Sequence, residues 1–180
     1  HFCAIFLLSV FESFKNSESF KKEFEERDAK ALENIAKAAA CGLEFIHNYS
    51  LVHDDLPDMD NDMLRRGKPT THAKFGPAMG ILAGDALLTE AFNLVSGETL
   101  KEAKAGAGAR VLEKGIRAMN ILGTCAGKDG MIYGQEIDLL NEGKQVPAET
   151  TLKMYELKTS KLLIAAFTAG AVLGGAGEEQ

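Results

Sequence analysis

The stretch that decides the fold is residues 28–62, which read DAKALENIAKAAACGLEFIHNYSLVHDDLPDMDND. Its first part is rich in Ala, Leu, Glu and Lys, contains no proline, and repeats apolar residues such as Ile35, Leu43 and Ile46 at helical spacing. Pro57 disfavours helical geometry at the residue before it. The sequence therefore predicts one long helix over residues 28–52, which ends or kinks before Pro57.

The end of this helix carries an acidic cluster, HDDLPDMDND at residues 53–62, with five carboxylates in nine positions. Carboxylates this close repel one another unless a cation lies between them, and Mg²⁺ prefers oxygen ligands and commonly bridges carboxylates to phosphates. Arg65, Arg66 and Lys68 follow directly and would complete an anion site. Composition alone leaves open a solvated acidic loop that is neutralised by its own arginines.

Other phosphate- and metal-binding motifs fit this chain poorly. An EF-hand loop across the cluster would need Gly and Glu where the chain has Met63 and Pro69. A phosphohydrolase of the HD type would use His53 but needs a further histidine well upstream, so this interpretation is weak. A dinucleotide-binding fingerprint at residues 106–108 lacks its third glycine and a preceding strand.

Composition narrows the class of protein and its partners. The length of 180 residues predicts one domain, and a net charge of −6 argues against a nucleic-acid partner. Three cysteines without C-x-x-C spacing argue against disulfides and zinc, so we expect a reducing, cytoplasmic compartment. The apolar runs at residues 2–10 and 162–175 are too short to span a bilayer. Both are expected to be buried helices, and no membrane span is predicted.

The rest of the chain is also helical in composition. Residues 61–77 have the Gly, Pro and basic residues of a loop, and Pro77 suits the start of a helix. Residues 101–140 predict further helix, in which glycines at 123, 127, 130 and 134 would share one face. A last helical pattern runs from Pro147 to about Gly174. Strand patterning is absent.

His47 lies seven residues before Asp54, which places the two side chains on nearly the same helical face ~10 Å apart. That separation would fit two adjacent phosphate sites, although a lone histidine is more often a core or surface residue.

Several segments together resemble the trans-isoprenyl diphosphate synthases of the farnesyl and geranylgeranyl type. They are EFIHNYSLVHDDLP at residues 44–57, DNDMLRRGKPT at 60–70, LAGDALL at 82–88, GQEIDL at 134–139, and Lys158 with Thr159. The resemblance implies an all-α, antiparallel helical bundle of the isoprenoid synthase type around a deep central pocket. It implies a Mg²⁺-dependent prenyltransferase that joins an allylic diphosphate to isopentenyl diphosphate, acts as a homodimer, and makes farnesyl or geranylgeranyl diphosphate.

The same resemblance assigns roles to individual residues. Asp54 and Asp60 become the Mg²⁺ ligands, with Asp55 in support and Asp58 as an alternative ligand. Arg65, Lys158 and Thr159 would hold the allylic diphosphate, and Arg66 and His47 would hold isopentenyl diphosphate. Gln135 and Asp138 are expected to face the pocket or to orient Lys158. The catalytic set is then Asp54, Asp55, Asp60 and Lys158.

The family's second aspartate-rich motif is not among these residues, so residues 1–180 are expected to be the N-terminal and central part of a longer domain, inactive alone. A non-catalytic helical subunit that keeps only the first motif is the alternative function. Tyr49 lies five residues, or ~7.5 Å along a helix, from Asp54. Its ring either packs in the core or forms the floor of the pocket. The resemblance favours a floor and a fifteen-carbon product.

Overall fold

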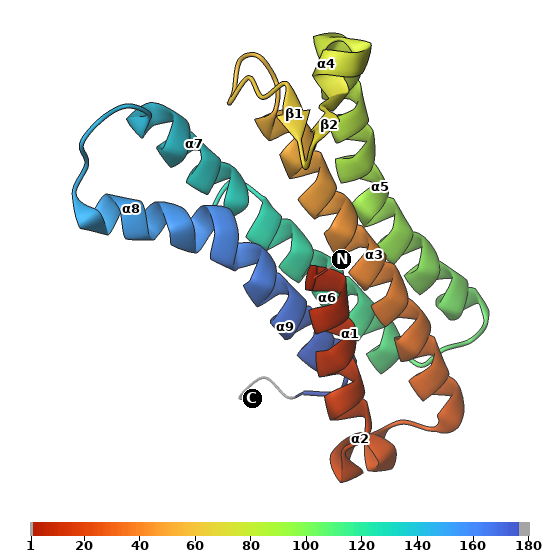
Figure 1. Ribbon diagram of the computed structural model, residues 1–180. Coiled ribbons are helices and arrows are strands. Elements are labelled where there is room, and N and C mark those ends of the chain that lie inside the picture. The colour runs from red at the N-terminus through yellow and green to blue at the C-terminus, as the bar shows by residue number, and fades with distance from the viewer. Residues whose placement is uncertain (1, 177–180) are drawn as a thin grey trace.

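The computed structural model describes residues 2–176 and consists almost entirely of helices (Figure 1). In chain order the elements are α1 (Phe2–Lys15), α2 (Glu18–Glu23), α3 (Glu26–Asp54), β1 (Leu64–Arg65), β2 (Lys68–Pro69), α4 (Thr71–Phe75), α5 (Pro77–Lys104), α6 (Ala109–Ala126), α7 (Met131–Asn141), α8 (Ala148–Tyr155), the π-helical turn η1 (Glu156–Ser160) and α9 (Lys161–Leu173). The all-α fold class is confirmed.

The long helix α3 packs against α1, α5, α6 and α9 and so forms the centre of the bundle. Its inward face carries Leu32, Ile35, Leu43 and Ile46, which are fully buried. Burying an aliphatic side chain of this size contributes ~1.5–3 kcal/mol. This apolar face therefore holds the helix in place, and the predicted end of the helix before Pro57 is confirmed.

Helices α1 and α9 form from the two apolar runs and pack against each other. Their backbones approach closely at Gly170, where a Cβ atom would lie 2.5 Å from the Leu7 carbonyl oxygen. Leu7 is fully buried, but Phe2 is 65% exposed and Ile5 61% exposed. The expectation of a buried helix is wrong for this outer face, because the main contacts of α1 are with α3 and α9 on one side.

The expected helical glycine stripe is also wrong. Helix α6 ends at Ala126 and α7 begins at Met131, so Gly127 and Gly130 lie in the break between them. There the Gly130 N–H donates a 3.0 Å hydrogen bond to the Gly127 carbonyl oxygen. Beyond this break α7 continues roughly along the line of α6 and packs against η1.

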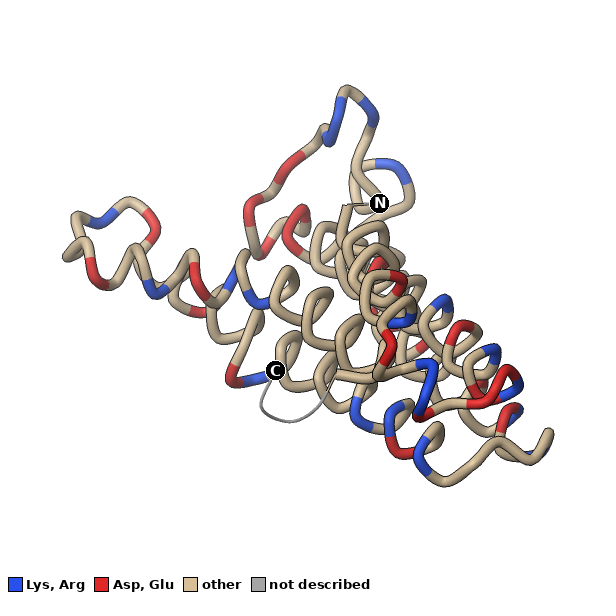
Figure 2. The backbone as a smooth tube through the Cα atoms, turned by 90° about the horizontal axis from the view of Figure 1, so that it is seen from below, with Lys and Arg blue, Asp and Glu red and all other residues tan. Residues whose placement is uncertain are grey.

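The segment between α3 and α5 contains more structure than the predicted loop. Strands β1 and β2 form a two-residue hairpin whose turn residues, Arg66 and Gly67, have positive φ angles of 52° and 76°. Strands this short leave no alternating pattern in a sequence. Thr70 Oγ1 donates a 2.7 Å hydrogen bond to the Asp62 carbonyl oxygen, which ties the base of the loop. Figure 2 shows acidic positions leading into this segment and basic positions at its tip.

Candidate active site

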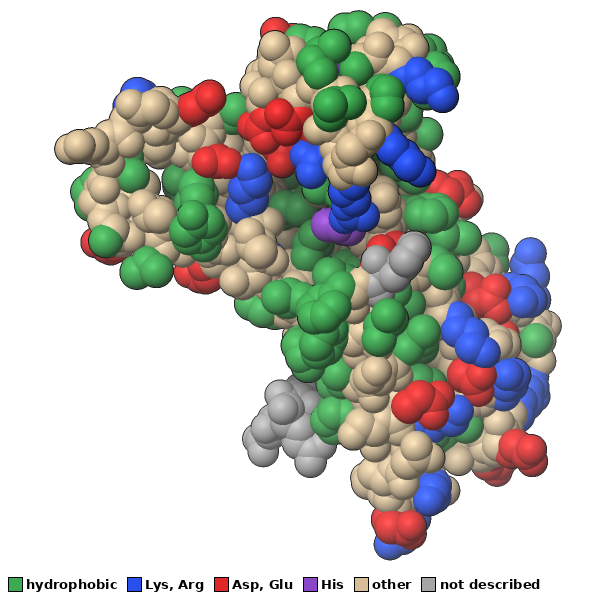
Figure 3. Space-filling model, viewed as in Figure 1, with side chains coloured by type: hydrophobic (Ala, Val, Ile, Leu, Met, Phe, Trp, Pro, Cys, Tyr) green, Lys and Arg blue, Asp and Glu red, His purple; other side chains and the backbone are tan. Residues whose placement is uncertain are grey.

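A cavity of about 910 Å³ opens between α3, α7 and the η1–α9 segment, beside the start of α1. Its walls are mostly apolar, and its polar side chains gather at one end. Figure 3 shows this arrangement as a hollow with a histidine inside it and acidic and basic side chains around its upper rim. The polar and aromatic lining residues are Phe2, His47, Tyr49, Ser50, His53, Asp54, Arg66, Gln135, Glu136, Lys158 and Thr159.

Four of the predicted site residues meet at the end of α3. Gln135 Nε2 donates a 2.5 Å hydrogen bond to Asp54 Oδ1. Lys158 Nζ lies 2.6 Å from Asp138 Oδ2 and 3.5 Å from Asp54 Oδ2. Burial alone would lower the Lys158 pKa, but the hydrogen bond to Asp138 and the neighbouring carboxylates outweigh it and raise the pKa. The ammonium group is therefore held charged beside Asp54.

Asp60 is brought next to Asp54 by the turn that follows α3. The Asp60 N–H donates a 2.9 Å hydrogen bond to the Asp54 carbonyl oxygen, which closes this turn. Burial, followed by the charge of Asp54, raises the pKa of the Asp60 carboxyl group. A divalent cation between the two carboxylates would remove this repulsion, so their chemistry fits Mg²⁺.

Asp58 and Asp60 are both exposed, and neither is among the residues that line the cavity. Within residues 2–176, no group of three or more His, Cys, Asp or Glu side chains is arranged to hold a metal ion. Metal binding by Asp54 with Asp60, or with Asp58 as the alternative ligand, therefore stays a prediction.

Asp55 and Arg65 form a buried pair that the sequence did not predict. Arg65 Nε lies 2.8 and 3.0 Å from the two Asp55 carboxylate oxygens, and Nη2 lies 2.6 Å from Oδ1. Asp55 is only 3% exposed. The structure thus commits Arg65 to Asp55, while Arg66 lines the cavity. The resemblance assigned both adjacent arginines to diphosphate binding, but their surroundings in the structure differ.

His47 and Tyr49 line the cavity from α3. Burial lowers the His47 pKa, so this imidazole is biased toward its neutral form. Tyr49 is 6% exposed, and its ring meets the His53 ring edge-on at a centroid distance of 5.7 Å. Both residues therefore lie where the sequence places them, below the acidic end of α3.

Two glycines outside the predicted site residues shape the site. The His53 ring lies directly on Gly84 of α5, where a Cβ atom would overlap it, and His53 Nε2 is 3.0 Å from the Ile81 carbonyl oxygen. Gly134 of α7 lies against the backbone of η1 at Lys158. Isolated glycines inside helical patterns were the available signal, since they mark close backbone approaches.

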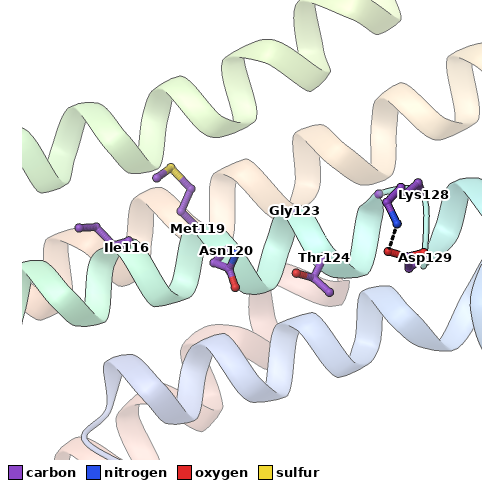
Figure 4. Close-up of a pocket in the computed structure, with 8 residues that line it drawn as sticks. Ile116, Met119, Asn120, Gly123, Thr124, Lys128 and Asp129 are labelled. Carbon is purple, nitrogen blue, oxygen red and sulfur yellow. Dashed lines mark hydrogen bonds and ion pairs between the residues drawn. The ribbon is translucent and has the colours of Figure 1, made fainter.

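A second, smaller cavity of about 500 Å³ lies along α6 (Figure 4). It is lined by Ile116, Met119, Asn120, Gly123, Thr124, Gly127, Lys128 and Asp129. Its charged residues, Lys128 and Asp129, form an ion pair and are 87% and 73% exposed. This cavity shares no residue with the larger one and contains none of the predicted site residues.

Comparison with known proteins explains the larger cavity. The sequence profile of the polyprenyl synthetases matches residues 5–180. The chain belongs to the polyprenyl synthetase family. It is 48% identical over 139 residues to the farnesyl diphosphate synthase of Bacillus subtilis, and this match covers 77% of the chain and 45% of that enzyme. The chloroplastic geranylgeranyl pyrophosphate synthase of Catharanthus roseus is 43% identical over 149 residues, and this match covers 82% of the chain and 40% of that enzyme.

A solved structure of the same fold is the Helicobacter pylori geranyltransferase complexed with magnesium and isoprenyl diphosphate. It superposes with a TM-score of 0.73 at 31% identity, covering 97% of this chain and 58% of that one. The chain thus spans less than half the length of the two curated relatives. Membership of the family confirms the resemblance drawn from the motifs.

Proposed function

We propose that the protein containing this chain is a Mg²⁺-dependent prenyltransferase that condenses an allylic diphosphate with isopentenyl diphosphate, head to tail. The observation that carries the proposal is the cavity itself, whose walls are mostly apolar and whose lining includes Asp54, Gln135 and Lys158, with Asp60 beside Asp54. An apolar chain fits the walls, and a diphosphate fits the charged end.

The residues at the charged end would divide the work of binding. Asp54 and Asp60 would hold Mg²⁺, which when bound supplies positive charge that stabilises the leaving diphosphate. Lys158 and Thr159 would bind the allylic diphosphate, since Arg65 is occupied by Asp55. Arg66 and His47 also line the cavity and would bind isopentenyl diphosphate. The two substrates would then use different cationic side chains.

The apolar walls would protect the reaction. Cleavage of the allylic C–O bond leaves a cation, which the double bond of isopentenyl diphosphate attacks, and loss of a proton then gives the longer allylic product. Water in the cavity would capture the cation first, so a dry pocket favours carbon–carbon bond formation. Leu139, Leu162 and Leu163 belong to this apolar lining.

The test is an assay of the full-length protein with isopentenyl diphosphate and a ten-carbon allylic diphosphate. We expect a longer prenyl diphosphate by chromatography, formed with Mg²⁺ and absent with EDTA. No product under any metal condition, from folded protein, would overturn the proposal and favour the non-catalytic subunit.

We further propose that residues 1–180 are the N-terminal and central part of a longer synthase, because the relatives are about twice as long. Two carboxylates at the rim would hold too few Mg²⁺ ions to neutralise the charge of a bound diphosphate completely. The isolated 180-residue chain is therefore expected to turn over no substrate. Product formation by this chain in pure form would contradict the expectation.

Tyr49 is proposed as the floor that limits product length. Its buried ring lines the cavity and is held by the edge-on contact with His53. A fifteen-carbon product is expected, and Tyr49→Ala should shift products to longer chains by removing the ring. Tyr49→Phe, which keeps the ring, is the matched control. Unchanged chain length in Tyr49→Ala would contradict this role.

A homodimer is proposed from the outer surface of α5 and α6. Within the described part of the chain, α5 is the one helix long and apolar enough to cross a membrane, yet only 22% of its apolar window is buried. Its exposed side chains include Met79 (52%), Leu82 (59%) and Leu100 (56%). The smaller cavity on α6 lies close to α5, since a Cβ atom at Gly123 would lie 3.5 Å from the Phe92 ring.

A second copy would cover these apolar side chains. We also propose a cytoplasmic location, which the three free cysteines favour. Light scattering of the full-length protein should give twice the monomer mass. A monomer at assay concentration would contradict the dimer, and recovery in the membrane fraction would contradict the cytoplasmic assignment.

A further inference from the structure

The helical line from α8 to α9 is interrupted by the π-helical turn η1, and Lys158 lies inside this turn. Helix α7 reaches the turn at Gly134. A Cβ atom at Gly134 would lie 2.7 Å from Lys158 Cα and 2.8 Å from the Leu157 carbonyl carbon, and it would also overlap the Lys158 nitrogen. All three atoms belong to the backbone, so none could rotate away.

This backbone contact lies next to the polar contacts of the site. The next residue of α7, Gln135, donates to Asp54, and one helical turn further along Asp138 accepts from Lys158. Lys158 Nζ is 2.6 Å from Asp138 and 3.5 Å from Asp54. The distance between α7 and η1 therefore sets whether one ammonium group reaches both carboxylates.

A small change in this distance would have a large effect. Moving the Lys158 ammonium group outward by ~1 Å would stretch its 2.6 Å contact with Asp138 to ~3.6 Å, which is too long for a hydrogen bond. Leu157, the neighbour of Lys158 in η1, is 3% exposed and fixes the turn on the core. A displaced η1 would thus either lose Leu157 packing or carry Lys158 away from the site.

We propose that Gly134 is a positioning residue, which acts through the backbone of η1 to hold Lys158 between Asp54 and Asp138. The proposal rests on the proposed function of Lys158. Its physical basis is that glycine alone has no Cβ to push the turn away. π-Helical turns are frequent at functional sites, and here the turn and the glycine form one unit.

The test is a double-mutant cycle in the full-length enzyme with Gly134→Ala and Lys158→Met. Gly134→Ala should lower kcat by roughly 100-fold, since a misplacement of ~1 Å can cost that much. In the Lys158→Met background the same substitution should lower kcat by less than about 3-fold, because no ammonium remains to be displaced. Gly97→Ala is the matched control: a Cβ there meets no atom within 4 Å, and kcat should not change.

The outcomes separate this inference from the proposed function. A wild-type kcat in Gly134→Ala, or an equal loss in both backgrounds, would overturn the positioning role, because a merely structural contact costs the same with or without Lys158. A wild-type kcat in Lys158→Met would instead refute the proposed role of Lys158. If Gly134→Ala does not fold, the pair Gly134→Ala/Leu157→Ala is measured, since truncating Leu157 gives η1 room to shift. Wild-type kcat in that folded pair would also overturn the proposal.

Discussion

The two ends of α3 treat their carboxylates in opposite ways. Near the base, three lysines donate hydrogen bonds of 2.6–3.2 Å to Glu33 and lower its pKa to about 2. At the rim, burial and the charge of Asp54 raise the pKa of Asp60. The charged form of Glu33 is stabilised by neighbouring lysines, whereas the charged form of Asp60 is disfavoured by burial and by the charge of Asp54.

We interpret the difference as a division between charges that serve the fold and charges that, in the proposed function, serve a ligand. Lys15 of α1 reaches Glu33 of α3, so the ion pairs at the base join two helices. At the rim, repulsion between Asp54 and Asp60 lowers the stability of the fold. In the proposed function, a bound cation would remove this repulsion. Substitutions at the base should therefore change stability alone, and substitutions at the rim should change catalysis first.

The largest expected effect is at Asp54. In the full-length enzyme, Asp54→Asn should lower kcat by at least ~100-fold, because charge stabilisation develops mainly in the transition state. The melting temperature should stay the same or rise, since a repulsive charge is removed. Steady-state kinetics and thermal unfolding measure both effects. A loss of stability with unchanged kcat would show that Asp54 has a structural role, like Glu33, and would contradict its catalytic role.

Asp55 should behave as a structural residue although it adjoins Asp54. Asp55→Asn leaves Arg65 without its buried anionic partner and should lower the free energy of unfolding by about 2 kcal/mol, less than for a fully buried pair because the Arg65 side chain is 32% exposed. Asp58→Asn is the control, since Asp58 is exposed and should stay within about 0.5 kcal/mol of wild type. Urea denaturation measures the difference, and equal stability of the two variants would contradict it.

Glu33→Gln should lower stability by about 1 kcal/mol at neutral pH, a modest value because its lysine partners remain partly solvated. The folded-state pKa of about 2 lies below the ordinary glutamate value of 4.5, so the contribution is present above about pH 4.5. It disappears as the pH falls from there through about 2. Urea denaturation of both proteins at several pH values should show the gap closing in acid, and a gap independent of pH would refute the ion-pair origin.

The smallest effect is expected at Gly97 in α5. Its replacement by Ala meets no neighbouring atom and removes the flexibility of a helix-interior glycine, so stability should rise by about 0.5 kcal/mol. Thermal unfolding checks the sign. A destabilised variant would show that the outer surface of α5 is covered at this position.

Much of the site could be predicted from local patterns. The helix over residues 28–52, its end before Pro57 and the placement of His47 and Tyr49 below Asp54 depend on one helix and its period, so they hold in any packing. The meeting of Asp54 with Gln135 and Lys158 was implied by resemblance alone. Asp54 is more than 80 positions from each of the other two residues, and only the packing of α3, α7 and η1 brings the three together.

The sequence by itself determined the family, the all-α class and the acidic cluster at the end of α3, because motif spacing and helical periodicity are local. Only the tertiary structure decided that Arg65 binds Asp55 while Arg66 faces the cavity, and that α6 and α7 separate at Gly127. It alone showed that Gly134 touches the backbone of η1. Such choices depend on contacts between distant segments, and a single sequence records the residues that allow them without recording their partners.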